Sequence, residues 1–262
     1  MKALANDTRE SILSWRKWYL IGMQSIRAAY ARSRIGHFWI TFLFMTLVVT
    51  LGFIYTALWQ VRIEEFLPFF ALSQLIWVFM SGVTLEAAHT YQAYAGYIKA
   101  QYQPKSIFVF AAIFKHLVIL AHNAVVVIAV YVYFWKPVSW VALLTLPGLL
   151  LLVLNCYWIA LVVALACARF RDIPSVVASL VQITFFISPI LWPPTAVKNP
   201  ELKLLLIDLN PVANLMAIVR DPLMGTAPSA FVYLYCAAFT LLGLGFAGVA
   251  FAKAHRRLVY WI

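Results

Sequence analysis

Arginine is the first residue type whose spacing points to chemistry. Arg9, Arg16, Arg27 and Arg34 follow one another at intervals of 7, 11 and 7 residues, so they form one row along a helix over residues 8–35. Apolar and aromatic residues recur beside this row at steps of three and four: Ile12, Trp15, Tyr19, Met23, Ile26 and Tyr30. This pattern is typical of a helix in a membrane interface, with its guanidinium groups on lipid phosphates. The alternative is a solvated helix of a cytoplasmic domain.

The histidines and cysteines form no recognisable catalytic or metal-binding pattern. His116 and His122 are six residues apart, about 600° of helical turn, so they do not share a face. The three cysteines lie in apolar runs and match neither a disulfide framework nor a zinc site. The sequence has no phosphate-binding G-x-x-x-x-G-K-[ST] loop, no G-x-S-x-G and no H-E-x-x-H motif. We therefore expect no catalytic residue, no metal and no cofactor on this chain.

Three polar or small features inside apolar stretches have structural interpretations. His122-Asn123 is expected to hydrogen-bond a neighbouring helix, with a substrate contact as the alternative. Glu86 lies near the end of its stretch, where an ion pair with Lys or Arg is expected and a gating role is the alternative. Gly243 and Ala247 form a small-xxx-small pair that allows two helices to approach closely.

The composition indicates an all-α membrane protein. Of the 262 residues, 65% are apolar and 11% are charged, and the mean hydropathy is +0.89. Soluble domains are about 45–50% apolar and about 25% charged. The values exclude a soluble globular enzyme, a disordered chain and an ordinary nucleic-acid-binding module, and no nucleic acid is expected as a partner. The net charge of +11 then reports orientation in the membrane.

Six apolar stretches are long enough to cross a bilayer core of about 30 Å as helices. Their bodies are Phe38–Trp59, Phe66–Leu85, a segment from near Ile107 to Lys136, Val138–Ala168, Ile173–Val197 and Pro222–Ala252. Pro189, Pro193 and Pro194 are expected to end or break the fifth stretch. Six spans put both termini on one side, which carries 15 Lys and Arg against 5 on the other, so both termini are expected in the cytoplasm. Residues 1–35 would form the interface helix and residues 36–262 one six-span domain, without a cleavable signal peptide.

The segments between these stretches are expected to hold further helices. Thr90–Ser106 is interpreted as a short cytoplasmic helix closed by Pro104. Residues 189–228 contain seven of the twelve prolines, which excludes a single helix there. Two apolar pieces of this region, Leu202–Leu209 and Val212–Val219, are expected to re-enter the outer leaflet, where protein or a water-filled cavity covers their backbone.

Aromatic residues are abundant, with 19 Phe, 13 Tyr and 10 Trp. Some flank the spans and fit interfacial belts. Others lie in the body of spans one, two and five, where ring faces could pave a path for the apolar face of a sugar. The residues predicted to line or gate such a channel are Phe42, Tyr55, Trp59, Trp77, Phe185 and Phe186. Packing against lipid is the competing interpretation for each of them.

Several motifs, in this order, resemble those of the ABC-2 permeases that export polysaccharides, namely the O-antigen (Wzm-type), capsule and teichoic-acid permeases. They are Arg32-Ser33-Arg34-Ile35-Gly36-His37-Phe38-Trp39, Gly96-Tyr97-Ile98-Lys99, Pro104-Lys105-Ser106, Arg169-Phe170-Arg171-Asp172-Ile173, Ser188-Pro189-Ile190-Leu191-Trp192 and Leu209-Asn210-Pro211. The resemblance covers nearly the whole chain. One departure is Gln103-Pro104-Lys105-Ser106, where many members have a hydrophobic residue followed by Pro and Arg.

The resemblance implies a half-transporter in the bacterial inner membrane. Two copies would pair around a channel, and two separate ABC subunits would bind ATP and Mg below them. The cargo would be a polysaccharide linked to undecaprenyl diphosphate, whose phosphates would contact Arg16, Arg27, Arg32 or Arg34. The loops expected to couple to the ATPase contribute Tyr94, Tyr97, Ile98, Lys99, Arg169, Arg171 and Asp172.

Other functions compete with this one. Within the same class, the chain could export capsule, teichoic acid or another amphipathic lipid or drug. A membrane transferase would need clustered catalytic acids or histidines at one membrane face, which the sequence lacks. A scaffold subunit without a transport role would leave the broken spans unexplained.

Overall fold

The computed structural model describes residues 2–30, 36 and 38–262, and within them the chain is 84% helical and contains no strand. Five helical segments are long and apolar enough to cross a membrane, which confirms a multi-pass, all-α membrane protein. They are α3 (Phe38–Trp59), α4 (Ile63–Ala93), α6 (Ser106–Tyr133), α7 (Thr145–Arg169) with the short helix η1 (Trp140–Leu144) ahead of it, and α11 (Ala230–Ala254).

The predicted fifth span is shorter than expected. In its place α8 (Ile173–Ile187) has 15 residues, about 22 Å at 1.5 Å per residue, which is less than a bilayer core. The helix ends because Ser188 precedes Pro189 and adopts an extended conformation, with φ −89° and ψ 151°. Further prolines keep the following residues out of a long helix, so the break expected at Pro189, Pro193 and Pro194 is confirmed.

A bent pair of short helices follows α8. It consists of α9 (Pro200–Lys203) with the π-helical turn η3 (Leu204–Asp208), and then α10 (Pro211–Leu223), which is bent from them by 75°. The pair corresponds to the two apolar pieces expected to re-enter the membrane. The described residues give six spans only if this pair crosses as one broken span.

The last span begins later than predicted. Pro222 belongs to the end of α10, and Gly225 then turns the chain with a φ of +84°, a conformation that favours glycine. The next helix, α11, starts at Ala230, eight residues after the predicted start.

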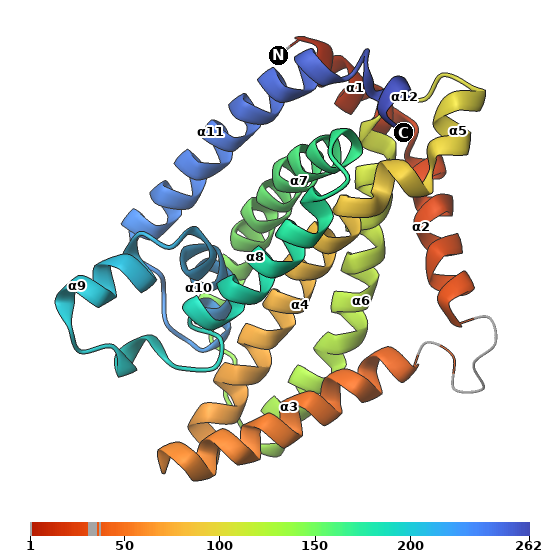
Figure 1. The fold of residues 1–262 in the computed structure, drawn as a ribbon. Coiled ribbons are helices and arrows are strands. Elements are labelled where there is room, and N and C mark those ends of the chain that lie inside the picture. The colour runs from red at the N-terminus through yellow and green to blue at the C-terminus, as the bar shows by residue number, and fades with distance from the viewer. Residues whose placement is uncertain (1, 31–35, 37) are drawn as a thin grey trace.

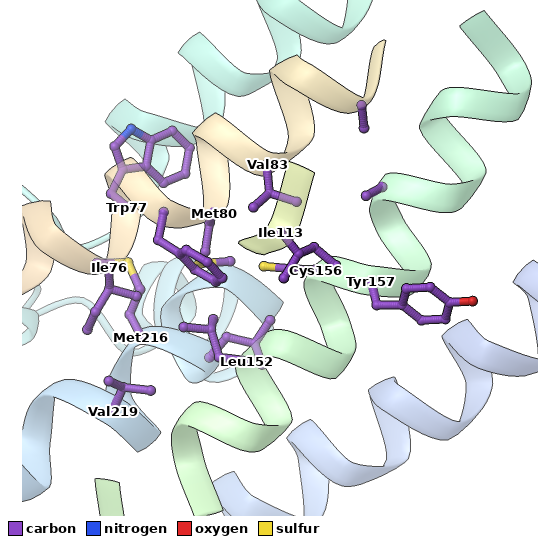
Figure 2. Close-up of a cluster of buried hydrophobic side chains, with 14 of the residues drawn as sticks. Ile76, Trp77, Met80, Val83, Ile113, Leu152, Cys156, Tyr157, Met216 and Val219 are labelled. Carbon is purple, nitrogen blue, oxygen red and sulfur yellow. The ribbon is translucent and has the colours of Figure 1, made fainter. Parts of the chain in front are cut away.

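Helix α4 is the centre of the bundle (Figure 1). In its most apolar window 83% of the residues are buried, against 17% in α3. An apolar sequence on all sides of α4 suits this position. Figure 2 shows α4 side chains meeting those of α6, α7 and α10 in one cluster of Ile76, Met80, Val83, Ile113, Leu152, Cys156, Met216 and Val219.

Small residues let α7 approach its neighbours closely. A Cβ atom at Gly243 of α11 would fall on the ring of Trp158 in α7, and Ala247 is fully buried. The same contact holds a polar pair, because the Asn155 amide donates to the Thr240 hydroxyl at 2.7 Å. The close approach predicted from the small-xxx-small pair is therefore confirmed.

Replacing Gly148 with alanine is expected to destabilise the fold by about 1–3 kcal/mol through overpacking. A Cβ atom at Gly148 of α7 would overlap the backbone carbonyl of Ile218 in α10, which cannot rotate away as a side chain can. Unfolding can be followed with a maleimide dye, because the three cysteines are free and buried. Gly245→Ala is the control, since no atom lies within 4 Å of that Cβ position. Equal transitions for the two variants would contradict the tight α7–α10 contact.

The N-terminal segment forms two helices rather than one, α1 (Lys2–Leu13) and α2 (Trp15–Tyr30). Helix α2 packs against α6 through Trp18, whose ring lies 5.7 Å from that of Phe114. The apolar and aromatic face predicted to lie in the membrane interface is in part exposed, at Trp15 and Tyr19. Both termini, α5 (Ala95–Ala100) and α12 (Leu258–Trp261) lie at one end of the bundle (Figure 1), here called the terminal end.

Candidate functional site

Helix α5 at the terminal end, with the Tyr94 that precedes it, holds four of the predicted coupling residues. Tyr94 is half-buried and stacks on Phe108 of α6, with 5.0 Å between ring centroids. Ile98 is buried inside the chain, so it is not a surface anchor in this conformation. Tyr97 and Lys99 are exposed, so these two predicted coupling residues are available to a partner.

The turn between α7 and α8 holds the other three predicted coupling residues. Arg169, Arg171 and Asp172 are all exposed. The guanidinium carbon of Arg169 lies 4.9 Å from the ring of Phe170 and 5.5 Å from that of Trp261. Because α12 contacts both α5 and α7, the structure brings the two predicted coupling loops to the same end.

A buried polar network that the sequence did not reveal ties this end together. The Asp7 carboxylate accepts hydrogen bonds from the backbone N–H groups of Lys105 at 2.7 Å and Ser106 at 2.8 Å, so α1 caps the start of α6. The Tyr157 hydroxyl lies 2.7 Å from Thr8 Oγ1 and 2.9 Å from Ser106 Oγ. Burial lowers the pKa of the Lys105 ammonium, and the charge of Asp7 opposes that shift.

The arginines predicted to contact lipid phosphates are described in part. Arg16 and Arg27 are exposed on α2, and the guanidinium carbon of Arg16 lies 5.7 Å from the ring of Trp15. Arg32 and Arg34 lie outside the described residues. The two described arginines are therefore open to an anionic headgroup beside an aromatic side chain.

The six predicted channel aromatics fall into three separate groups. Phe42 is exposed near the start of α3. Tyr55 and Trp59 pack edge to face at the end of α3, with 5.4 Å between ring centroids. The third group joins α4 to α8, because the Trp77 ring lies 5.7 Å from Phe185 and Phe185 lies 5.3 Å from Phe186.

Of these three groups, the one between α4 and α8 combines a buried aromatic ring with an exposed one. The Trp77 side chain is buried, whereas Phe186 is 61% exposed. A continuous aromatic wall from the bundle core to the surface results at this place. Such a wall suits weak, interchangeable contacts with a sliding ligand.

Two motifs far apart in the sequence meet where α8 ends and α10 begins. The Asn210 side chain accepts hydrogen bonds from the N–H groups of Val212 at 2.9 Å and Ala213 at 3.2 Å, so it caps α10. Its amide also donates to the Ser188 hydroxyl at 3.2 Å. The Ser-Pro that closes α8 and the Asn-Pro that opens α10 thus form one joint.

A buried arginine fastens this joint to the central helix. Arg220 of α10 donates to the Pro189 carbonyl at 3.1 Å, the Ser73 hydroxyl at 3.3 Å and the Asp221 carboxylate at 2.9 Å. Its guanidinium carbon lies 4.6 Å from the ring of Phe69. Sequence reasoning missed this buried role; the position of Arg220 directly after the apolar piece Val212–Val219 was the available signal.

Glu86 forms the expected ion pair. Its carboxylate lies 2.8 Å from the Lys115 ammonium and 2.9 Å from His116 Nε2, which links α4 to α6. Gly82 allows this contact, because a Cβ atom there would meet the His116 ring. The pair is about a quarter exposed on both sides.

The expected interhelical hydrogen bond is not found at the side-chain oxygen of Asn123 within the described residues. Nδ1 of His122 lies 2.8 Å from the Val118 carbonyl of its own helix. The side-chain oxygen of Asn123 is buried without a hydrogen-bond partner among the described residues. The Thr41 hydroxyl reaches α6 instead through the backbone carbonyl of His122, at 3.3 Å.

Neither a metal-ion cluster in the described residues nor a sequence match indicates the function. Within residues 2–30, 36 and 38–262, no three His, Cys, Asp or Glu side chains are close enough to hold a metal ion. No protein-family model matches the sequence, and no curated protein is significantly similar to it. The arrangement of charges, rings and broken helices is therefore the guide to function.

Proposed function

We propose that this chain is the permease subunit of an ATP-driven ABC exporter of the ABC-2 type. It moves a lipid-linked polysaccharide, an undecaprenyl-diphosphate-linked O-antigen, from the cytoplasm across the bacterial inner membrane. The sequence motifs that resemble those of polysaccharide permeases are the basis of the proposal. The observation that supports it best is the joint between Ser188 and Asn210, at which two of these motifs pack together beside a bent helix pair.

The terminal end is the surface proposed for the ATPase. The 15 basic residues assigned to this side favour a cytoplasmic position. Tyr97 and Lys99 on α5 are exposed there, and Arg171 and Asp172 are exposed at the same end of the bundle. Because the chain has no phosphate-binding loop, the energy comes from separate ATP-binding subunits, two of them for a pair of permease chains.

The glycan path is proposed along the aromatic wall of Trp77, Phe185 and Phe186. Exposed apolar side chains continue along α8 at Val176, Leu180 and Ile183. In the membrane this face of α8 contacts either lipid or a second copy of the chain. A second copy placed against α8 would enclose the wall as a channel. Arg16 and Arg27 then serve as the described contacts for the lipid diphosphate.

The chain is expected to purify as a dimer in complex with two copies of an ATPase encoded beside it, and to hydrolyse no ATP alone. Tyr97→Asp should lower the amount of co-purified ATPase about tenfold or more, because aromatic anchors contribute much of the energy of an interface. Co-purification from membranes and a hydrolysis assay measure both effects.

Tyr97→Phe is the matched control and should retain the ATPase. The thermal transition of each variant shows that the fold is intact. ATP hydrolysis by the single chain, or a full complement of ATPase on Tyr97→Asp, would contradict the proposal. Glycosyl or acyl transfer by the purified chain would favour the membrane-transferase alternative.

A further inference from the structure

Three cations share one groove at the terminal end. Arg169 at the end of α7, Lys253 in the last turn of α11 and Arg257 just before α12 line a groove of about 650 Å³. All three are exposed. In the part of the chain that the structure describes, every ion pair within 4 Å uses other cations, so these three have no carboxylate partner.

The rest of the groove is apolar. Its walls are Val162, Leu165 and Ala166 of α7 and Phe246 and Ala250 of α11. From Val162 to Arg169, and from Phe246 to Lys253, each helix rises about 10 Å at 1.5 Å per residue. The groove therefore presents positive charge at one end and about 10 Å of apolar surface leading away from it.

Compensation of helix dipoles explains part of this arrangement. Arg169 and Lys253 stand in the last turns of their helices, where cations are favourable. It does not explain why cations of different elements meet over one apolar groove. Nor does it explain the position of the Arg169 guanidinium carbon, 5.5 Å from the centroid of the Trp261 ring. A guanidinium group stacked on a ring face can still donate hydrogen bonds from its N–H edge to an anion.

We propose that this groove binds an anionic phospholipid of the surrounding membrane. The headgroup phosphate lies among Arg169, Lys253 and Arg257, and the upper part of an acyl chain lies along the α7–α11 wall. Basic pockets between membrane helices suit anionic headgroups for this reason. Helix α7 separates the groove from the aromatic wall between α4 and α8, which favours a resident phospholipid over a transported lipid. The inference is independent of the proposed transport function.

The test is a lipid titration of the purified full-length chain, followed by native mass spectrometry. The probes are a phosphatidylglycerol and a phosphatidylcholine with the same acyl chains. Lys253→Gln with Arg257→Gln should weaken phosphatidylglycerol binding about 30-fold, since each charge near an anionic surface contributes about fivefold. The matched control, Lys198→Gln with Lys203→Gln, removes the same charge from exposed positions on the α8–α10 connection.

The proposal is supported if the wild-type chain and the control variant retain phosphatidylglycerol in preference to phosphatidylcholine, and the groove variant does not. Unchanged phosphatidylglycerol affinity in the groove variant overturns it. Displacement of the lipid by a polyprenyl diphosphate at equal concentration overturns it in favour of the cargo lipid. Loss of a co-purified ATPase, with lipid binding unchanged, assigns the groove to a protein partner instead. Thermal transitions verify that both variants are folded.

Discussion

Replacing Arg220 with methionine is expected to lower the free energy of unfolding by about 3–5 kcal/mol, as for a buried charge network that loses one member. Arg220 is 3% exposed and donates hydrogen bonds to Asp221, Ser73 and Pro189. Methionine fills a similar volume but leaves a hydroxyl and a backbone carbonyl without a donor. The joint between α8 and α10 then loses its bond to α4, so the bent helix pair should loosen first.

The matched control is Arg62→Met, which also breaks a pair with a carboxylate. The pair of Arg62 and Glu64 is solvent-exposed, at 72% and 51% of the side chains, so its loss should change stability by less than about 1 kcal/mol. Maleimide labelling of Cys156, Cys167 and Cys236 during heating reports both unfolding transitions. If the two variants unfold together, the buried network adds no stability.

Composition and apolar length predicted most of the fold. Five of the six stretches correspond to long helices, because a continuous apolar run in a membrane protein has few stable alternatives to a helix. Proline predicted that the fifth stretch would break, and the break falls at Ser188-Pro189. The start of α11 was predicted wrongly, because apolar length alone does not show that Pro222 closes one helix before the next begins.

The sequence predicted the ion pair of Glu86 but neither of the two buried polar networks, whose members lie far apart in the chain. Asp7 and Lys105 are 98 positions apart, and Arg220 and Ser73 are 147 apart. A lone charge in an apolar segment requires a partner, but many groups can satisfy it, and tertiary packing selects one. Ile98 shows the same limit, since a six-residue helix is too short for a periodic pattern to indicate its buried face.

Replacing Glu86 with glutamine is expected to destabilise the fold by about 2–3 kcal/mol, toward the lower end for a broken buried pair because the site is about a quarter exposed. Glutamine keeps the shape and can still accept a hydrogen bond from His116. It cannot balance the charge of Lys115, whose ammonium then lies in an apolar helix 2.8 Å from a neutral group. The shift is measured by the same cysteine-labelling transition.

The double variant Glu86→Gln with Lys115→Met separates a structural role from a gating role. If the pair is structural, removing the unpaired cation should restore about 0.5–3 kcal/mol, the range of coupling between contacting groups, and the proposed glycan export should recover with it. If Glu86 has a gating role in the proposed permease, the double variant should regain stability while export stays lost. A double variant no more stable than Glu86→Gln alone would show that Lys115 is not the group that Glu86 neutralises, and would leave His116 as its partner.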